Sequence, residues 1–525
     1  MTQIESWEII RIVIRMKSRN KIIIGAVLSF FSLGVINAQQ GLQSSYFMEG
    51  SLFRHELNPA FASLQSYVSM PALGQIGAGA RGNLGLSNLF YYRNGKTVTY
   101  LHPDVSTMEA LNGINDNNKV QLDVKTQIIG VGFRGLGGFN TIGLSARVFA
   151  GMHVPYDLFA LTKDLQNKSY QIGGVGLLAQ GYAELAIGHS HRIDEHWSVG
   201  GKFKLLIGAA RASADLQELT LDLQGTNQWT ASAHAVVETN IKGLSTTTAH
   251  KSYNDPDKNQ LKNTATGETY GYETIDKFNM DKAGIGGLGM AVDLGAEYDF
   301  ADIVPGLKVS LACLDLGFIN WNVSRMIKNN GERFIFDGFH DIQVNGGPGR
   351  KASDQADELA DRLVDLYRLQ DQGDQGSRIH GIGATLNIGC EYALSVYDKL
   401  RFGFLSSTRL LGDYTWNEER LSVNYAPADF FDFNINGAVS SFGPSLGWMI
   451  NLHPVGFNFF IGMDHTLGKV SKQFIPLSSN ASFMMGINFP LNRVKKHSEE
   501  EPGEVDEYEQ LLRNYSDGED DENYF

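Results

Sequence analysis

The sequence predicts an all-β fold, a transmembrane antiparallel β-barrel of about 14 strands, from three observations. The first is alternation, seen most plainly in Ala291–Phe300, where Asp293 and Glu297 lie between apolar residues at every second position. Side chains on a strand point to alternate faces, so this segment has one apolar and one polar face. The second is the recurrence of this pattern from residue 121 to residue 489, without continuous apolar runs. The third is that short connections alternate with long ones, as in barrels with short periplasmic turns and longer outer loops.

Alternation and turn residues place the candidate strands along the chain. They lie near 67–80, 121–134, 140–153, 180–193, 197–212, 284–300, 307–320, 379–396, 400–411, 418–426, 430–441, 445–453, 456–464 and 480–489. The short connections are Gly135–Phe139, Asp194–His196, Ala301–Gly306, Tyr397–Lys399 and Pro454–Val455, and the long segments are 81–120, 154–179, 213–283, 321–378 and 465–479. Ala214–Leu223 and Trp229–Glu238 also alternate, and we expect them to extend strands beyond the membrane or to form an outer hairpin.

The phase of the alternation decides which side chains face the barrel interior. Burying Lys202, Lys204 or Arg147 against lipid would cost about 2–4 kcal/mol each at mid-depth, so these side chains must point inward. The candidate lumen residues are Arg147, Lys202, Lys204, Asp293, Glu297, Glu391, Asp432 and Asn434. We expect the acids among them to be solvated and able to set a charge preference. The alternative is a large soluble β-sandwich with a polar outer face. The strands of soluble proteins average only about 5–6 residues, so the longer strands expected here favour the barrel.

The amino terminus has the features of an export signal. Basic residues within 17–21 precede the apolar run Ile22–Ile36, and the small residue Ala38 follows shortly after. This order is typical of a cleaved secretory signal, and the run is shorter than the ~20 residues that a transmembrane helix needs. We therefore predict a signal peptide over 1–38 with Met16 as the true start. A genuine amphipathic amino-terminal segment is the alternative.

Residues 39–66 precede the first candidate strand and contain Asn58-Pro59-Ala60. An Asn-Pro-Ala segment at this place resembles the amino-terminal hatch of the fatty-acid transporter family of barrels, a group that includes the barrel component of the type IX secretion system. The continuation through Tyr67-Val-Ser-Met-Pro-Ala-Leu-Gly and Gly82-Asn-Leu-Gly looks like an uncharacterised outer-membrane family of Bacteroidota, known only as a domain of unknown function.

That resemblance covers most of residues 40–490. It implies a hatch-like segment at 39–66 and an outer-membrane barrel at 67–490. The tripeptide by itself would also suit an ordinary turn, because proline fixes φ and asparagine favours turns.

Two segments depart from the strand pattern. Within Ser353–Gln370 the residues Leu359, Leu363, Leu366 and Tyr367 repeat at helical spacing, which predicts a short amphipathic loop helix at the barrel mouth. Residues 491–525 carry 12 acidic and 4 basic side chains, and this charge predicts a disordered acidic tail on the periplasmic side.

No motif predicts catalysis or a bound cofactor. Gly284–Gly289 spells a dinucleotide fingerprint, but a strand follows it where the mechanism needs a helix, so close strand packing explains the glycines better. His189, His191 and His196 suit the membrane interface better than a metal site, because no second cluster completes a coordination sphere.

The cysteine count and the net charge exclude further classes. Cys313 and Cys390 are too few for a disulfide framework or a four-cysteine metal site. A formal net charge of −14 argues against a nucleic-acid partner. We therefore expect no enzyme, no cofactor and no metal.

The expected function is that of a cell outer-membrane β-barrel protein that transports or binds a small solute. The resemblance to the fatty-acid transporter family implies that this solute is hydrophobic. The alternative is an outer-membrane interaction scaffold associated with protein secretion or surface assembly, which the long outer loops and the acidic tail favour. Expected partners are outer-membrane lipid, the barrel assembly machinery, and either the solute or a periplasmic protein.

The signal peptide gives a direct prediction. Amino-terminal sequencing of the mature protein from the membrane fraction should begin at Gln39, because cleavage after Ala38 leaves the small residue at the exit of the apolar core. A mature chain that retains Trp7 would contradict the export signal.

Overall fold

The computed structural model describes residues 42–63, 65–164, 166, 168–224, 229–252, 271–280, 282–329, 334–336, 369–466 and 480–491. All of them belong to one compact unit, Met1–Asn492. The predicted signal peptide and the predicted acidic tail after Leu491 lie outside the described residues.

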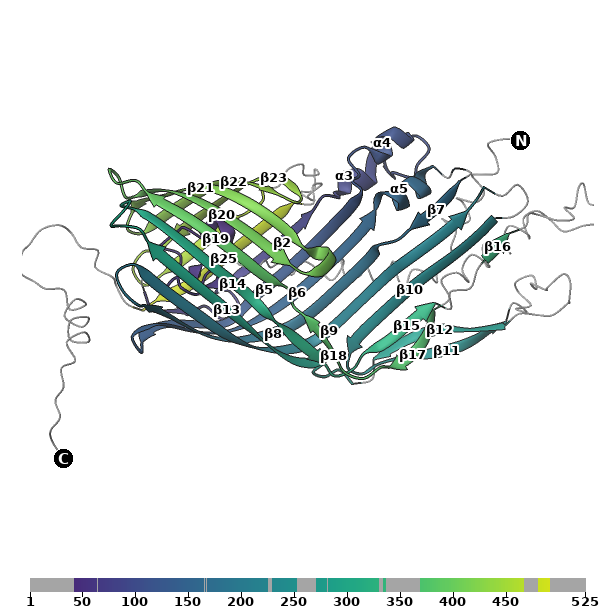
Figure 1. Ribbon diagram of the computed structural model, residues 1–525, viewed down its shortest axis with the longest axis horizontal. Helices are drawn as coiled ribbons and strands as arrows, with labels where there is room; N and C mark the ends of the chain where they lie inside the picture. The colour runs from purple at the N-terminus through teal and green to yellow at the C-terminus, as the bar shows by residue number, and fades with distance from the viewer. Residues whose placement is uncertain are drawn as a thin grey trace, which may run out of the picture. The chain divides into compact units, whose positions relative to one another are not determined.

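The described chain forms a closed antiparallel β-barrel of fourteen strands, as the alternation predicted (Figure 1). The first strand consists of β1 (Tyr67–Ser69) and β2 (Ile76–Gly82), and the eighth of β18 (Arg378–Gly381) and β19 (Ala384–Ala393). The others are β5 (Asn117–Gly135), β6 (Gly138–Pro155), β8 (Val175–Arg192), β9 (Trp197–Asp222), β13 (Gly287–Asp299), β14 (Leu307–Trp321), β20 (Leu400–Leu410), β21 (Trp416–Ala428), β22 (Phe431–Ser440), β23 (Gly443–Leu452), β24 (Asn458–Met463) and β25 (Ala481–Pro490). Each pairs with the next, and β25 pairs with β1 and β2, which closes the sheet.

Two of the predicted strands are interrupted. The first was expected to run through 67–80, but residues 70–75 bulge from the ladder and Ala72 has a positive φ of 57°. Proline at position 71 removes a ladder donor, so the strand breaks where the ladder would need that N–H. The eighth breaks at Ile382 and Gly383, where glycine has a φ of 89°.

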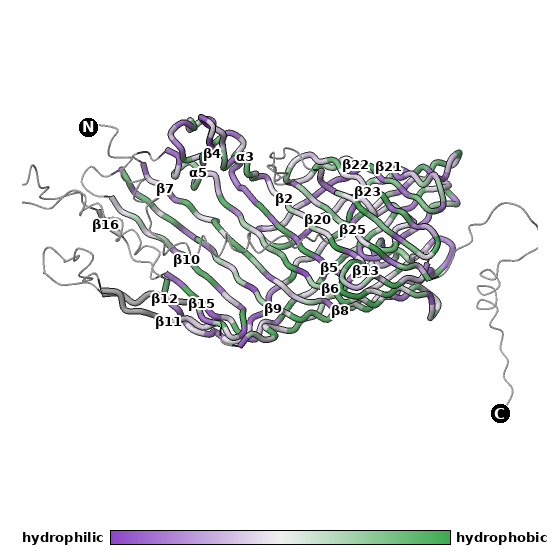
Figure 2. The backbone as a smooth tube through the Cα atoms, turned by 180° about the vertical axis from the view of Figure 1, so that it is seen from behind, coloured by the Kyte–Doolittle hydropathy of each residue, from purple (hydrophilic) through white to green (hydrophobic). Residues whose placement is uncertain are grey.

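The two faces of the sheet differ as period-two alternation requires. On β9, Phe203 and Leu205 are 51% and 40% exposed on the outside, whereas Lys202 and Lys204 are buried inside. Figure 2 shows the same alternation of hydrophobic and hydrophilic residues along the strands. An apolar outer face over a sheet with paired edges is the arrangement that lipid demands.

The turns at one end of the barrel are all short. They are 136–137, 193–196, 300–306, 394–399, 429–430 and 453–457. The opposite end carries the long segments, although the connections 411–415 and 441–442 at that end are also short.

Two groups of elements extend the barrel at the end with long connections (Figure 1). The second half of β9 continues as a sheet with β7 (Ser169–Ile172), β10 (Trp229–Ile241), β15 (Arg325–Asn329), β16 (Phe334–Phe336) and β17 (Leu369–Asp374). Residues 214–222 extend β9, and 229–238 belong to β10, which pairs with this extension as a hairpin, so both expected arrangements occur. The second group contains α3 (Leu86–Leu89), β3 (Phe90–Arg93), β4 (Lys96–Thr99), α4 (Thr107–Leu111) and α5 (Tyr156–Lys163). A separate hairpin pairs β11 (Leu244–Ser252) with β12 (Gly271–Met280).

The predicted loop helix over 353–370 falls mostly outside the described residues. Its last two residues, Leu369 and Gln370, belong to strand β17, so the helix cannot extend as far as predicted. None of the helices in the described part of the chain is long and apolar enough to cross a bilayer.

The closing strand gives a test of the barrel. On β25 the side chains of Phe483 and Phe489 face outward, and Phe489 is 41% exposed. A chain truncated after Leu491 should still reach the outer membrane as a folded barrel, because β25 already closes the sheet. Replacing both phenylalanines with aspartate should abolish assembly, because two carboxylates would then face lipid.

The readout is the difference in gel migration between boiled and unboiled protein. Replacing both phenylalanines with leucine is the matched control, since it keeps the outward face of the same strand apolar. If the truncated chain failed to fold and the double aspartate variant folded, the placement of the last strand would be wrong.

Candidate functional site

The amino-terminal residues 42–63, called the inner segment below, pack against the inward face of the barrel wall. The segment contains two short 3-10 turns, η1 (Gln43–Ser45) and η2 (Arg54–Glu56). Its large apolar side chains are all buried: Leu42, Tyr46, Phe47, Met48, Leu52, Phe53, Leu57 and Phe61. It lies in the part of the chain where the sequence placed a hatch-like segment.

The Asn-Pro-Ala motif fits a depression in the wall that two glycines create. Gly200 on β9 and Gly295 on β13 are cross-strand partners. A Cβ at Gly295 would collide with the Asn58 amide, and one at Gly200 with the Pro59 carbonyl. Glycine at both positions therefore lets the segment approach the wall this closely.

Asn58 also binds the wall directly. Its Nδ2 donates to the backbone carbonyls of Ala296 at 3.3 Å and Leu311 at 3.4 Å, which belong to adjacent strands. Its Oδ1 accepts from the N–H of Ala60 at 3.0 Å, so the motif also holds its own turn. The Ala60 carbonyl accepts from Ser190 Oγ on β8 at 2.9 Å.

The start of the inner segment is held by a carboxylate that sequence reasoning missed. Asp464, just after β24, accepts the backbone N–H groups of Gln43 at 3.0 Å and Ser44 at 2.8 Å. Ser44 Oγ donates to the same carboxylate at 2.6 Å. On another side of the barrel, the hydroxyls of Tyr46 and Ser310 share a hydrogen bond of 3.0 Å. No local pattern marks Asp464, because its role depends on a contact 421 residues away in sequence.

The second turn of the segment meets two lysines of the wall. Burial and the neighbouring Lys202 ammonium hold the pKa of His55 well below its usual range, so its imidazole is neutral. Nδ1 of His55 accepts from Lys202 Nζ at 2.8 Å, and Nε2–H donates to Tyr67 Oη at 2.7 Å. Glu56 pairs with Lys125 at 2.9 Å.

The second carboxylate of the segment lies nearer the end with short turns. Burial alone would raise the pKa of Glu49, but its ion pair with Arg401 and the nearby Lys308 ammonium at 3.6 Å lower it to about 2. Arg401 also pairs with Glu391 at 3.3 Å. Glu49 is therefore ionised at neutral pH.

Halfway along the barrel, side chains from five strands form one ion-pair network. Arg147 makes two hydrogen bonds of 2.8 Å to Asp315 and one of 2.8 Å to Glu184. Lys204 binds Asp293 at 2.7 Å and Asp315 at 2.5 Å. A register shift between β13 and β14 brings the two aspartates together, and Asp315, at a positive φ of 58°, donates its N–H to Asp293 at 2.7 Å.

These contacts correct one expectation about the candidate lumen residues. Asp293 is 1% exposed and Glu391 is 3% exposed, so neither is solvated. Glu297 is partly exposed. Asp432 pairs with His453 at 2.9 Å, and Asn434 donates to Asn424 at 2.6 Å. The buried charges among these residues therefore pair with neighbouring side chains.

A further layer of charged and aromatic residues lies nearer the end with long connections. Arg409 on β20 reaches across the barrel to Asp123 on β5 at 2.9 Å. The guanidinium of Arg81 lies 4.4 Å from the ring centroid of Trp416, and that of Arg409 lies 5.3 Å from that of Phe149. Arg81, Asp123 and Arg409 lie on predicted or adjoining strands, but their pairing could not be found without the shape of the barrel.

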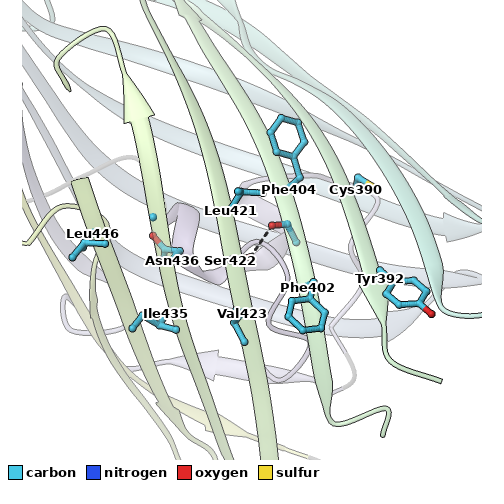
Figure 3. Close-up of a pocket in the computed structure, with 12 residues that line it drawn as sticks. Cys390, Tyr392, Phe402, Phe404, Leu421, Ser422, Val423, Ile435, Asn436 and Leu446 are labelled. Carbon is cyan, nitrogen blue, oxygen red and sulfur yellow. Dashed lines mark hydrogen bonds between the residues drawn. The ribbon is translucent and has the colours of Figure 1, made fainter. Parts of the chain in front are cut away.

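The outer face of β19 to β23 carries an apolar groove of about 570 Å³ (Figure 3). Phe402, Phe404, Leu421 and Ile435 line it. The Ser422 hydroxyl donates to a backbone carbonyl of the wall, and Asn436, which also borders the groove, turns its amide inward to Ser44. The groove therefore presents apolar groups to its surroundings, as a lipid-facing surface does.

Other candidates from the sequence have structural roles. Gly208 and Gly286 pack against the indole of the fully buried Trp321, which agrees with the packing interpretation of the glycine-rich stretch. His189 and His191 bond to Asn140 and to the Gly137 carbonyl near a turn. Within the described residues no group of three histidine, cysteine or acidic side chains could hold a metal ion. Cys313 and Cys390 are free.

The buried network gives a quantitative prediction. Arg147→Met should lower the free energy of unfolding by about 3–5 kcal/mol, because it leaves the buried Glu184 and Asp315 with Lys204 as their remaining counter-ion. The double variant Arg147→Met with Asp315→Asn should recover part of that loss. Urea unfolding in lipid vesicles measures both, with the exposed Lys96→Met as control. A loss no larger than that of the control would contradict the network.

Comparison with known proteins identifies a matching family and, among solved structures, distant neighbours of which three are described here. The toluene transporter TbuX of Ralstonia pickettii is 8% identical, with a TM-score of 0.38, and 86% of this chain aligns with 98% of that chain. A TodX monoaromatic hydrocarbon channel mutant is 8% identical, with a TM-score of 0.39 and coverage of 87% and 95%. A Pseudomonas aeruginosa FadL homologue is 13% identical, with a TM-score of 0.33 and coverage of 85% and 92%. Structural similarity at TM-scores this low does not indicate what this chain binds.

No curated protein matches the chain. The model of a family of unknown function matches residues 59–464, well over half of the chain and nearly the whole barrel. The match begins at Pro59, inside the motif that binds the glycine depression. An uncharacterised family was expected from the sequence, and this chain belongs to the family of unknown function DUF5723.

Proposed function

We propose that this chain is a gated barrel of the cell outer membrane that transports or binds a small hydrophobic solute, with the inner segment as its gate. The observation that carries the proposal is the way the segment is held. Its polar contacts are separate anchors on β13, β14, β19 and the turn after β24, together with a glycine depression shaped for Asn58 and Pro59. Its apolar side chains pack on the wall without a covalent or backbone-ladder connection to it. Such anchors can break without disrupting the closed wall, because the backbone ladder of the wall does not use them.

The outer surface supports placement in a bilayer. Among the described residues, inward charges pair with one another, whereas most outward positions of the same strands are apolar, which suits contact with lipid. The sequence predicts no catalytic residues, and we propose a function that involves no chemical reaction.

Apolar side chains at the end with long connections support a hydrophobic solute. Tyr170, Ile172, Leu219 and Leu223 form a buried cluster between α5 and the extended sheet, and Leu221 and Trp229 pack against it. The cluster itself is buried, but Leu221 and Trp229 are only half-buried and offer apolar surface to a solute that enters at this end. Each apolar contact favours the transfer of a hydrophobic solute from water.

The alternative, an interaction scaffold for secretion or surface assembly, has its own support. The group formed by α3, β3, β4 and α4 exposes Tyr92 at 71% and Met108 at 85%. Aromatic residues and methionine are enriched at protein interfaces.

A disulfide that fixes the inner segment tests the gate. Ser44 Oγ lies 2.6 Å from a carboxylate oxygen of Asp464, so Ser44→Cys with Asp464→Cys should form a disulfide. Cys313→Ala and Cys390→Ala remove the native thiols first. Uptake of the hydrophobic dye N-phenylnaphthylamine by cells that express this variant should fall, on oxidation, to the level of cells without the protein. Reduction should restore it, because the segment is then free to leave.

Each single cysteine variant, oxidised in the same way, is the control, and a gel shift verifies the disulfide. Unchanged dye uptake with the disulfide formed would reject the gate. Recovery of a periplasmic protein with the barrel would then favour the scaffold.

A further inference from the structure

Each of the six short turns at one end of the barrel carries an exposed apolar side chain. These side chains, called the turn ring below, are between 55% and 88% exposed: Leu136, Ile193, Ile303, Val396, Phe430 and Val455. The turns join successive strand pairs of one closed sheet, so the ring surrounds this end of the barrel (Figure 1). Turn formation does not require such residues, because glycine, proline, asparagine, aspartate and serine suit turns better. The ring is an exposed apolar surface that the fold of the barrel does not explain.

One member of the ring is held in an unfavourable backbone conformation. Leu136 and Gly137 form the two-residue turn between β5 and β6, with φ angles of 56° and 72°. A turn with two positive φ angles favours Asn-Gly, and a leucine there is strained because its Cβ crowds the following carbonyl oxygen. The side chain of Leu136 is exposed, so packing within the barrel does not offset this strain. A contact outside the barrel would explain why leucine occupies the position.

The turn ring has an acidic border. The six turns contain five acids and one lysine: Asp194, Glu195, Asp302, Asp398, Asp429 and Lys399. Asp302 directly precedes Ile303, and Asp429 directly precedes Phe430. A partner that covers the ring therefore meets apolar side chains and negative charge together.

We propose that the turn ring is the docking surface for a periplasmic protein that presents apolar side chains bordered by lysine or arginine. The short turns of outer-membrane barrels face the periplasm, which sets the compartment of the partner. Burial of the ring would provide affinity, and opposite charges at its border would orient the partner. The proposal shares only the outer-membrane location with the gate proposed above, because the anchors of the inner segment lie outside these turns.

Two other occupants suit the turn ring less well. The phosphates of a bilayer surface are negative, so acids such as Asp302 and Asp398 oppose insertion of the turns into lipid. The barrel also has separate aromatic residues for the membrane interface, since the rings of Trp197 and Tyr298 pack with their centroids 4.8 Å apart. A second copy of this chain would bring two identical acidic borders together in a symmetric contact. A basic protein surface has neither disadvantage.

Photo-crosslinking in living cells tests the proposal. Val396→p-benzoylphenylalanine places a photoreactive group in the turn ring. Val439→p-benzoylphenylalanine is the matched control, because Val439 is exposed on the lipid-facing side of β22. Illumination should give a protein adduct from position 396 and none from position 439. Mass spectrometry should find more lysine and arginine than acids in the crosslinked segment of the partner.

Charge reversal shows whether the adduct depends on the acidic border. Adding Glu195→Lys and Asp398→Lys to the Val396 variant should lower the adduct yield about tenfold, because repulsion replaces attraction at two points. Asp104→Lys with Asp116→Lys makes the same change of charge at the end with long connections and should leave the yield unchanged. The shift between boiled and unboiled protein verifies that each variant is folded.

Leu136→Asn separates docking from stability. Asparagine tolerates the left-handed conformation, so the variant barrel should unfold at a higher urea concentration than the wild type. The adduct yield from position 396 should nevertheless fall, because the ring loses an apolar member. A leucine with a purely structural role would give the opposite result, a lower urea concentration and an unchanged yield.

Several results would overturn the proposal. An adduct with phospholipid, with a second copy of this chain or with an acidic protein segment would assign the ring to another occupant. No adduct at position 396, or an equal effect of the two charge reversals, would show that the ring does not dock a basic protein. Dye uptake measures the gate separately, so a failure of either proposal is distinguishable from a failure of the other.

Discussion

The free-energy cost of placing a charge against lipid determines which way the side chains of each strand point and how the barrel interior is organised. Each strand has only two faces, so every Arg, Lys, Asp or Glu in mid-membrane has to point inward once the outer face is apolar. The interior then collects charges from all sides, and in a space too narrow for bulk water these charges have to pair. The network of Arg147, Lys204, Asp293 and Asp315 and the pair of Arg409 with Asp123 follow from that requirement. The inner segment takes part in the same balance, because Glu56 and Glu49 pair with cations of the wall.

The sequence predicted the parts of the fold that depend on local periodicity. Fourteen strands, their inward faces and the short turns at one end follow from alternation and turn residues, which act over about ten residues. The helix end at Leu369 and Gln370 was wrong because helical spacing of a few leucines does not exclude a strand, and pairing with β15 decides the matter there. The break at 70–75 was missed, although Pro71 was visible in the sequence.

The candidate site was predicted only in outline. Alternation placed Arg147, Lys202, Lys204 and Asp293 on the inward face, but it could not show which of them meet. The bulge that turns Asp315 toward Asp293 and the reach of Arg409 to Asp123 depend on the shape of the closed barrel. The roles of His55, Glu56 and Asp464 were missed for the same reason, since their partners lie far away in sequence. Gly200 and Gly295 looked like ordinary strand glycines until the segment was seen against them.

The position of the inner segment also restricts the order in which the barrel can be assembled. The segment leads directly into β1, which pairs with β25, the last strand of the chain. Its first residues bind Asp464, so the contacts that hold it require the end of the chain to be present. Once β25 pairs with β1 and β2, the wall is closed, and the segment cannot pass between two strands. The segment can therefore reach its seated position only late in folding, and we expect contacts that span more than 400 residues to form slowly.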